Sequence, residues 1–360
     1  MRRFRCFTVL LSTLVLLVAA CGSANDAATT TSSAPVTDTV PTGEAALEQL
    51  ITDAKAEGEL MFYSTNLDVV NDAVAKAFEE KYGITTRHVP RESGPILLDR
   101  FRAERGAGGS PADVLISTSR GALDTLLADG LLEEMNPDLV PSLAALGEEA
   151  YSDSSVIVSV IPFMVCWNTD SVDGSAFKTM RDVLLPSDSN IKITTTNLQY
   201  EAYNTALDVL RQEYGLEFLQ EVGDRGFTFT DSAPASQQLL IAGEADVYFM
   251  CPPSVGATSK TQGAPVDYKL VGPTSGTGLA AGIAKDGPHP AAARLFLNWL
   301  MSVEGAAVIN GGGLGVSMVL PDGDAASGIL PFPTEADGFT LPHNADIANV
   351  KEIYKVLGMP

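Results

Sequence analysis

Segments with helical and with extended patterns alternate along the chain from Ala45 onward, and this alternation restricts the possible folds more than any other feature. A first helix is predicted over residues 47–56. Three extended runs then each precede an amphipathic run, with strands predicted at 59–63, 84–89 and 112–116 and helices at 69–82, 95–104 and 122–127. Repeated strand–helix units of this kind form a parallel sheet covered by helices. Gly83 follows the helix at 69–82, where a C-cap glycine would end it.

A second block of alternating segments follows the first. It begins with a long extended stretch at 155–167, interrupted by Pro162, and continues with strands at 190–195 and 246–251 and helices at 201–214 and 235–242. Extended segments at 268–271 and 278–283 and helices at 290–301 and 346–357 come last, and we place most of these back on the first block. Because 360 residues exceed what one compact core usually holds, we predict two lobes. Their expected bounds are 45–163 for lobe 1, 164–272 for lobe 2, and 273–360 for the return to lobe 1 and the C-terminal helices.

The N-terminus has the pattern of a secretory signal peptide over residues 1–20. Arg2, Arg3 and Arg5 precede an apolar run at 7–18 that is too short to span a bilayer. The run ends in Leu-Val-Ala-Ala-Cys-Gly at 17–22, which resembles the lipobox of bacterial lipoproteins. This resemblance implies cleavage before Cys21 and a lipid on Cys21, which would tether the protein to the outer side of the membrane. The alternative is an ordinary signal peptide with a chance cysteine.

Residues 21–44 are predicted to hold the lipidated cysteine and a flexible tether, because they are rich in Ala, Thr and Ser and have almost no large apolar side chains. Loss of residues 1–20 removes three arginines and no acidic residue, so the formal net charge falls from −22 to −25. This acidity argues against nucleic acid or an anionic membrane surface as a partner. An anionic ligand stays possible, since a pocket can be locally positive on a negative protein.

Two cysteines remain after Cys6 leaves with the signal peptide and Cys21 takes the lipid. Cys166 and Cys251 lie in a chain expected outside the cytoplasm, where disulfides form. The sequence leaves open whether they pair or are two buried thiols. It holds no Cys-x-x-Cys motif and no His/Cys cluster, so no metal site and no cofactor are predicted.

Polar runs follow each of the three predicted strands of the first lobe. In open α/β sheets, ligands bind beyond the carboxyl ends of the strands, near helix N-termini that favour negative charge. The candidate ligand contacts in these runs are Tyr63, Ser64, Thr65 and Asn66, then Arg91, Ser93 and Gly94, then Ser117, Thr118 and Ser119. Arg91 adds a planar donor suited to a carboxylate or phosphonate, so its replacement by alanine is expected to abolish anion binding. The alternative for each run is an ordinary helix cap.

The second lobe adds five further candidates for ligand contacts, which are Asn168, Tyr200, Tyr203, Ser232 and Ser254. Tyr200 and Tyr203 are three residues apart and so share one helix face. Asn168 lies where the chain is expected to cross between the lobes. For Tyr200 and Tyr203 the alternative is packing beneath the loop, and for Asn168 it is packing at the hinge.

Seven segments in order along the chain resemble the bacterial extracellular solute-binding protein family that includes the ferric-iron and 2-aminoethylphosphonate receptors of ABC importers. These segments are 58–64, 78–84, 111–114, 167–169, 242–245, 287–296 (Gly-Pro-His-Pro-Ala-Ala-Ala-Arg-Leu-Phe) and 300–305. The resemblance implies an α/β fold of the type II periplasmic-binding-protein kind, with two mixed sheets flanked by helices. It also implies a ligand cleft between lobes that close like a hinge, and a membrane permease as the partner. We expect a monomer.

The resemblance leaves the ligand open. Iron-binding members carry two adjacent tyrosines soon after the strand that corresponds to 246–251, whereas this chain has Cys-Pro-Pro-Ser at 251–254 and no adjacent tyrosine pair. We therefore expect a small organic anion such as a carboxylate or phosphonate, with a ferric-iron receptor as the alternative.

The other alternative is a secreted lipoprotein enzyme. The chain has no nucleophile elbow, no His-Glu-x-x-His motif and no P-loop, and its glycine-rich run at 311–315 lacks the P-loop lysine. We therefore predict a non-enzymatic, substrate-binding lipoprotein that captures its solute between the lobes and delivers it to the permease.

Overall fold

The computed structural model describes residues 43–109, 111–146, 150–199 and 201–359, which belong to one compact unit. The predicted signal peptide, the lipidation site Cys21 and the tether up to residue 42 lie outside the described residues, as does the candidate ligand residue Tyr200.

The first sheet has six strands in the order β2-β1-β3-β11-β5-β4. Its strands are β1 (Glu59–Ser64), β2 (Thr85–His88), β3 (Val114–Ser117), β4 (Tyr151–Ser152), β5 (Ser155–Pro162) and β11 (Gly276–Ile283). The strands β2, β1 and β3 are parallel, as the strand–helix pattern predicts, while β11 runs antiparallel to both β3 and β5. Gly83 ends helix α2 in the left-handed conformation with φ 72°, which confirms its predicted role.

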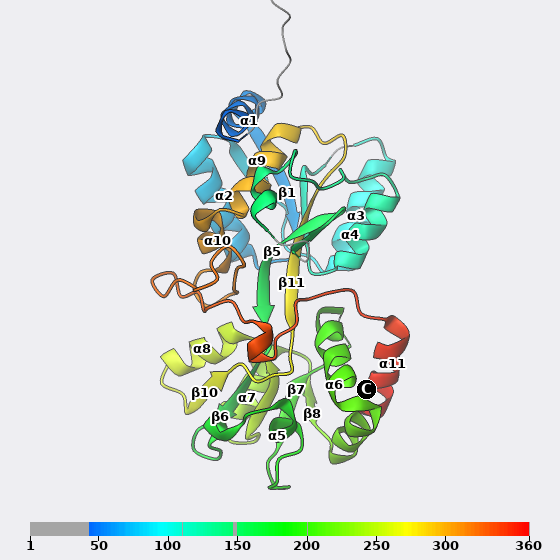
Figure 1. The fold of residues 1–360 in the computed structure, drawn as a ribbon, viewed down its shortest axis with the longest axis vertical. Helices are drawn as coiled ribbons and strands as arrows, with labels where there is room; N and C mark the ends of the chain where they lie inside the picture. The colour runs from blue at the N-terminus through cyan, green and yellow to red at the C-terminus, as the bar shows by residue number, and fades with distance from the viewer. Residues whose placement is uncertain (1–42, 110, 147–149, 200, 360) are drawn as a thin grey trace, which may run out of the picture. The chain divides into compact units, whose positions relative to one another are not determined.

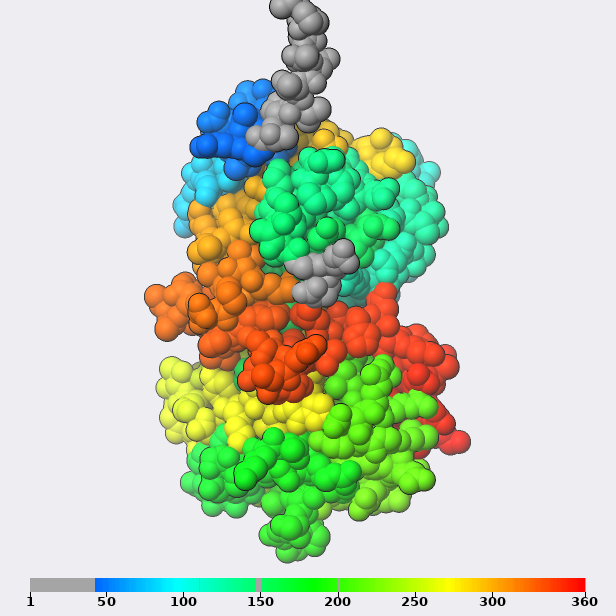
Figure 2. Space-filling view, in the orientation of Figure 1, coloured from blue at the N-terminus to red at the C-terminus, as the bar shows by residue number. Residues whose placement is uncertain are grey.

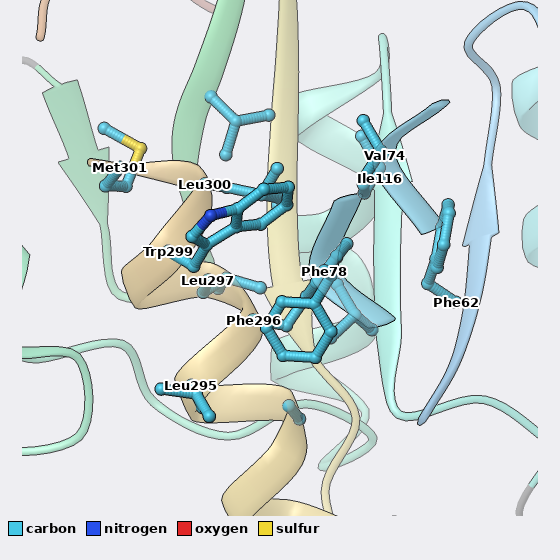
Figure 3. Close-up of a cluster of buried hydrophobic side chains, with 14 of the residues drawn as sticks. Phe62, Val74, Phe78, Ile116, Leu295, Phe296, Leu297, Trp299, Leu300 and Met301 are labelled. Atoms are coloured by element: carbon cyan, nitrogen blue, oxygen red, sulfur yellow. The ribbon is translucent and has the colours of Figure 1, made fainter. Parts of the chain in front are cut away.

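Helices cover both faces of this sheet (Figure 1). On one face lie α1 (Glu44–Glu57), α2 (Asp68–Tyr82), α9 (Pro290–Leu300) and α10 (Val303–Asn310), and on the other lie α3 (Gly94–Gly106) and α4 (Arg120–Ala128). Figure 3 shows part of the first core, with Phe296 beside Phe78 and near Trp299. The ring of Phe296 also stacks on Phe62 at 5.2 Å between centroids and meets Phe78 edge-on at 5.1 Å. Such pairs add to the stabilisation that comes from apolar burial.

The second sheet has five strands in the order β10-β6-β9-β7-β8. Its strands are β6 (Met164–Asn168), β7 (Ile193–Thr196), β8 (Thr228–Thr230), β9 (Val247–Cys251) and β10 (Val266–Lys269). The strands β9, β7 and β8 are parallel, and β6 and β10 are antiparallel, so this sheet is also mixed. Its helices are α5 (Met180–Leu184), α6 (Asn204–Arg225), α7 (Ala233–Ile241), α8 (Pro253–Thr261) and α11 (Ile347–Val356). The 3₁₀ turns within the described ranges are η1 (Pro141–Ala145), η3 (Gly174–Ala176), η4 (Glu201–Tyr203) and η5 (Glu335–Asp337).

Two expected elements differ in detail from the structure. The helix predicted at 201–214 begins as the 3₁₀ turn η4 and continues beyond Gly215, whose φ of 79° breaks the helical geometry, as far as Arg225. The last helix, α11, packs on α6 of the second lobe, where Ile353 and Leu357 join the core, while α9 and α10 return to the first lobe.

Three chain segments run side by side where the chain passes between the two sheets. The passage from β5 to β6 and the passage from β10 to β11 are joined by a hydrogen bond from the Phe163 N–H to the Ser275 carbonyl, 2.9 Å. The C-terminal segment joins them when the Thr340 N–H donates to the Thr274 carbonyl at 3.0 Å. Figure 2 shows this segment, in orange and red, crossing the face between the first sheet's helices and the second sheet's. Adjacent crossing strands of this kind are a geometry about which two lobes can hinge.

A buried carboxylate ties two of the sequence motifs together. Asp113 accepts hydrogen bonds from the Met61 N–H at 2.8 Å, and from the N–H and the Nδ1 of His289 at 2.9 and 3.1 Å. Burial raises the pKa of Asp113, while these hydrogen bonds oppose that rise. The Ala-Asp-Val and Pro-His-Pro motifs thus fix the start of α9 against β1 and β3.

No single helix within the described ranges combines the length and apolarity that crossing a membrane requires. Taken together, α9 and α10 are long and apolar enough to cross a membrane, but the two helices are bent by 79° at the break between them. Both helices bury side chains in the first core.

Candidate functional site

The three polar runs of the first lobe meet at one edge of the first sheet. The Oγ1 of Thr65, after β1, accepts a hydrogen bond from the N–H of Thr118, after β3, at 3.2 Å. A Cβ atom placed on Gly94, at the start of α3, would lie 3.6 Å from Ser117 Oγ and 4.0 Å from Thr65 Cγ2. The three runs therefore lie together, as expected for segments that follow the carboxyl ends of neighbouring parallel strands.

Most hydroxyl groups of these runs form hydrogen bonds with the loops of the first lobe. Ser64 Oγ accepts from the Asn66 N–H at 3.1 Å, and Ser117 Oγ accepts from the Ser119 N–H at 3.0 Å. Ser119 caps α4 by accepting from the Ala122 N–H, and its hydroxyl also donates to Glu201 Oε1 of the second lobe at 2.8 Å. Ser119 is thus a direct contact between the lobes.

Two predicted ligand residues of the first lobe, Arg91 and Tyr63, form hydrogen bonds with other residues of that lobe. Arg91 is exposed; its Nε donates to the Thr65 carbonyl at 3.0 Å and its N–H donates to Asp68 Oδ1 at 2.8 Å. Tyr63 points into the lobe, where its hydroxyl donates to Glu104 Oε2 at 2.8 Å. Burial, and then Glu104, raise the pKa of Tyr63 to about 12. The exposed Ser93 precedes α3 as its N-cap residue.

Most of the predicted ligand residues of the second lobe form structural contacts within that lobe. Asn168 donates through Nδ2 to the Leu240 carbonyl at 2.8 Å and is buried. The Tyr203 hydroxyl lies 2.9 Å from Thr196 Oγ1, and the Tyr203 ring stacks on Phe163 at 4.7 Å. Ser232 caps α7, and Ser254 lies in the first turn of α8.

A pocket of about 240 Å³ lies where the two lobes and the crossing segments come together. Its lining comes from the start of α4, from β5 and β11, from η4 and the start of α6, and from residues 342–347. Its polar lining residues are Thr118, Arg120, Glu201, Asn204, Thr205, Thr277, His343 and Asn344. Among the predicted ligand residues that the structure describes, Thr118 lines this pocket.

Arg120 is the basic group of the pocket. It is the first residue of α4 and is partly buried, and no hydrogen bond or ion pair engages it within the described ranges. Burial lowers the pKa of Arg120, and the nearby carboxylate of Asp124 opposes this. A guanidinium held at a helix N-terminus and short of partners is well placed to bind an anion.

The C-terminal segment forms one wall of the pocket and is bonded to both lobes. The hydroxyl of Thr205, on α6, donates to the His343 carbonyl at 2.6 Å, and the His343 N–H donates back to it at 3.2 Å. The amide of Asn344 donates through Nδ2 to Asp124 Oδ2 on α4 at 2.8 Å. This wall therefore spans the boundary between the lobes.

Sequence reasoning missed most of this lining. Arg120 lies within the polar run after β3 and Glu201 directly follows Tyr200, but neither residue is among the predicted ligand contacts. Thr277, His343 and Asn344 come from inside an antiparallel strand and from a late loop, which carry no local pattern for a ligand contact.

One structural question left by the sequence is answered away from this pocket. Cys166 and Cys251 form a disulfide between β6 and β9, with their Cα atoms 5.8 Å apart. In the part of the chain that the structure describes, no group of three or more His, Cys, Asp or Glu side chains is arranged to hold a metal ion.

Comparison with known proteins places this architecture in a family. A family model described as bacterial extracellular solute-binding protein matches residues 60–314, from β1 through α10. An uncharacterized protein of Haemophilus influenzae is 24% identical over 273 residues, which make up 70% of this chain and 75% of that protein.

Two solved structures are similar across most of the chain. Iron-bound HitA from Pseudomonas aeruginosa superposes with a TM-score of 0.63 at 19% identity, covering 84% of this chain and 97% of HitA. The periplasmic binding protein AfuA from Actinobacillus pleuropneumoniae, with fructose-6-phosphate bound, gives a TM-score of 0.60 at 18% identity, covering 84% of this chain and 97% of AfuA.

At these identities the two structures establish the fold, and they confirm the predicted type II arrangement of two mixed sheets flanked by helices. The family model covers far more than half of the chain and both of its sheets. The chain therefore belongs to the bacterial extracellular solute-binding protein family.

Proposed function

We propose that this chain is the substrate-binding lipoprotein of an ABC import system. It captures a small organic anion, such as a carboxylate or a phosphonate, in the pocket between the lobes and delivers it to a membrane permease. Arg120 is the observation that carries the proposal, because this partly buried guanidinium faces the pocket without a partner within the described ranges. Arginine in that position binds a carboxylate or phosphonate through two parallel hydrogen bonds.

The size and composition of the pocket support a small ligand. Its volume of about 240 Å³ is below the range of roughly 300–1,000 Å³ that holds drug-sized molecules. Apolar residues supply part of the lining. They would pack against a short carbon chain of the ligand, while the polar residues bind its charged end. In the first turn of α4 the Ala122 N–H is capped by Ser119, whereas the N–H groups of Arg120 and Gly121 have no partner within the helix and are suited to donate to the same anion.

HitA binds iron and AfuA binds fructose-6-phosphate, so the ligand class is inferred from this chain's own residues. Iron-bound HitA keeps ferric iron as the alternative ligand to be tested beside the organic anions. The extracytoplasmic location and lipid anchor in this proposal follow from the pattern at residues 1–22.

A thermal-shift screen tests the proposed ligand class. The sample is the chain without its predicted signal peptide and lipidated cysteine, residues 22–360, and the panel holds carboxylates, phosphonates, phosphate esters and ferric chelates. A ligand at about a thousand times its Kd adds about 4 kcal/mol to the free energy of unfolding, which gives a clear shift. We expect a shift with carboxylates or phosphonates. A shift with ferric chelates alone, or with no compound in the panel, would contradict capture of an organic anion.

Labelling of bacterial cells with an alkyne-tagged fatty acid tests the lipid anchor. We expect the wild-type chain to take up the label and to sediment with membranes, because a lipid on Cys21 holds the secreted domain at the membrane surface. The Cys21→Ser variant is expected to be unlabelled and released in soluble form. Label that persists in this variant would disprove the assignment of Cys21.

A further inference from the structure

Arg120 has a carboxylate close to it on its own helix. Asp124 follows four residues later on α4, and side chains at this spacing face the same side of a helix, where an arginine and an aspartate can form an ion pair. The charge of Asp124 does act on Arg120, since it opposes the fall in the pKa of Arg120 that burial causes. Within the described ranges, however, no ion pair joins the two side chains.

The carboxylate of Asp124 is bonded instead to two uncharged side chains. Its Oδ1 accepts from the Ser154 hydroxyl at 2.6 Å, and its Oδ2 accepts from Nδ2 of Asn344 at 2.8 Å. Ser154 is buried in the turn between β4 and β5, and Asn344 belongs to the C-terminal segment that forms a wall of the pocket. Each oxygen of Asp124 therefore has a donor from a different part of the chain.

Other contacts fix the position of Asn344. The preceding residue, His343, exchanges two hydrogen bonds with Thr205 of α6, at 2.6 and 3.2 Å. The amide of Asn344 lies against Gly121, where a Cβ atom would be 3.5 Å from the Asn344 Oδ1. Because Gly121 directly follows Arg120, this amide reaches the first turn of α4 and occupies Asp124 next to the anion-binding group.

Asp124 would lose both of these bonds if the two donors were absent. A carboxylate without donors would then gain from pairing with Arg120, one turn away on the same helix. A paired guanidinium binds a solute anion less well, because only the unpaired fraction is ready to accept it. The other carboxylate at the pocket, Glu201, accepts a hydrogen bond from the Ser119 hydroxyl at 2.8 Å.

We propose that Ser154 and Asn344 are positioning residues that keep Asp124 from pairing with Arg120, so that the guanidinium stays free for the solute anion. This inference rests on the proposed function and adds the residues that keep its anion site open. Ser154 is not among the described lining residues of the pocket, so its role does not depend on contact with the solute.

Calorimetric titration with butanoate and with propylphosphonate tests the proposal on the chain of residues 22–360. We expect the Ser154→Ala/Asn344→Ala variant to bind both anions about three- to sixfold more weakly, because an ion pair of ordinary strength then competes for Arg120. Ser154→Ala alone should show a smaller loss in the same direction. Thr125→Ala is the control and should bind as the wild type does, since this exposed neighbour of Asp124 bonds only the Gly121 carbonyl of its own helix.

Addition of Asp124→Asn identifies the cause of the loss. Asparagine keeps the shape of the side chain but cannot form the ion pair, so we expect the triple variant to return to within about twofold of the affinity of Asp124→Asn alone. Removal of a negative charge near an anion helps binding in any background, and the proposal therefore requires a larger gain in the double variant than in the wild type. An equal gain in both backgrounds would show that the two donors do not control the pairing.

A crystal structure of the Ser154→Ala/Asn344→Ala variant gives a result that needs no solute. We expect an Asp124 oxygen within about 4 Å of an Arg120 nitrogen, the distance of an ion pair. Side chains that stay apart in this variant would overturn the proposal. If the wild type binds neither anion, the proposed function fails for these solutes, while this structure still decides whether the donors keep Asp124 from Arg120. Should the double variant not fold, Ser154→Ala serves for both measurements.

Discussion

Replacement of Arg120 by alanine is expected to weaken binding of an acidic solute by about 10- to 150-fold without unfolding the chain. A hydrogen bond to a charged group contributes about 1.5–3 kcal/mol, and each 1.4 kcal/mol corresponds to a factor of ten in Kd. Arg120 makes no hydrogen bond or ion pair with another described residue, so its loss removes few contacts from the folded protein. Titration of the variant with the best ligand of the screen gives the change in Kd.

Two further variants make this result specific. Arg120→Lys keeps the charge but loses the planar pair of donors, so we expect an affinity between those of the wild type and the alanine variant. Arg91→Ala tests the competing site that the sequence pattern favours. Because Arg91 is exposed and its Nε donates to the Thr65 carbonyl of its own lobe, we expect this variant to weaken binding far less than Arg120→Ala, in place of the loss expected from the sequence alone. If Arg91→Ala abolishes binding and Arg120→Ala does not, the anion binds at the strand-end runs and the pocket assignment is wrong.

Local patterns in the sequence predict the order of the main elements well. The alternation of strand and helix predicts β1, β2 and β3 with their helices, and Gly83 marks the end of α2 as expected. Elements that depend on tertiary partners are less visible. The strand β8 has three residues at a sheet edge, and α8 begins in a Pro-Pro sequence that resembles a loop. The packing of α11 on the second lobe depends on contacts with α6, far away in the sequence.

The candidate site is harder to predict than the fold. A polar side chain can bind a ligand only where its donors and acceptors are not already bonded to other residues of the protein. Arg91 and Arg120 both follow strands and both look suitable for an anion. The hydrogen bond from Arg91 Nε to the Thr65 carbonyl, and the absence of any hydrogen bond or ion pair of the Arg120 guanidinium within the described ranges, distinguish the two side chains. That hydrogen bond joins separate loops and leaves no trace in either local sequence.

The cysteine pair illustrates the same limit. Composition and compartment allow a disulfide but do not identify one, and both a bond and two buried thiols fit the sequence. In the antiparallel pairing of β6 and β9, Met164 lies opposite Cys251 and Cys166 opposite Tyr248, with an irregularity between Met164 and Val165, and the Cα atoms of the two cysteines are 5.8 Å apart. That spacing is within the usual range for a disulfide.

Removal of this disulfide is expected to lower the free energy of unfolding by about 2–4 kcal/mol. The bond joins residues 85 positions apart and closes most of the second lobe, from β6 through β9, into one loop. Such a long loop strongly restricts the unfolded chain, which is the main source of the stabilisation in the loop-entropy account. Denaturant unfolding of the Cys166→Ala/Cys251→Ala variant, compared with the oxidised wild type, measures the loss.

A second sample separates the covalent bond from side-chain packing. Cys166 and Cys251 are both buried, and a Cβ atom on Gly256 would lie 2.9 Å from Cys166 Sγ, so the alanine variant also loses packing contacts. The wild type, reduced in denaturant and unfolded under reducing conditions, keeps both sulfur atoms and loses only the bond. We expect it to show most of the loss seen in the double variant. Because neither cysteine lines the pocket, the ligand affinity of the folded double variant should equal that of the wild type. A stability loss confined to the alanine variant would show that packing of the two sulfur atoms, and not the closed loop, stabilises the second lobe.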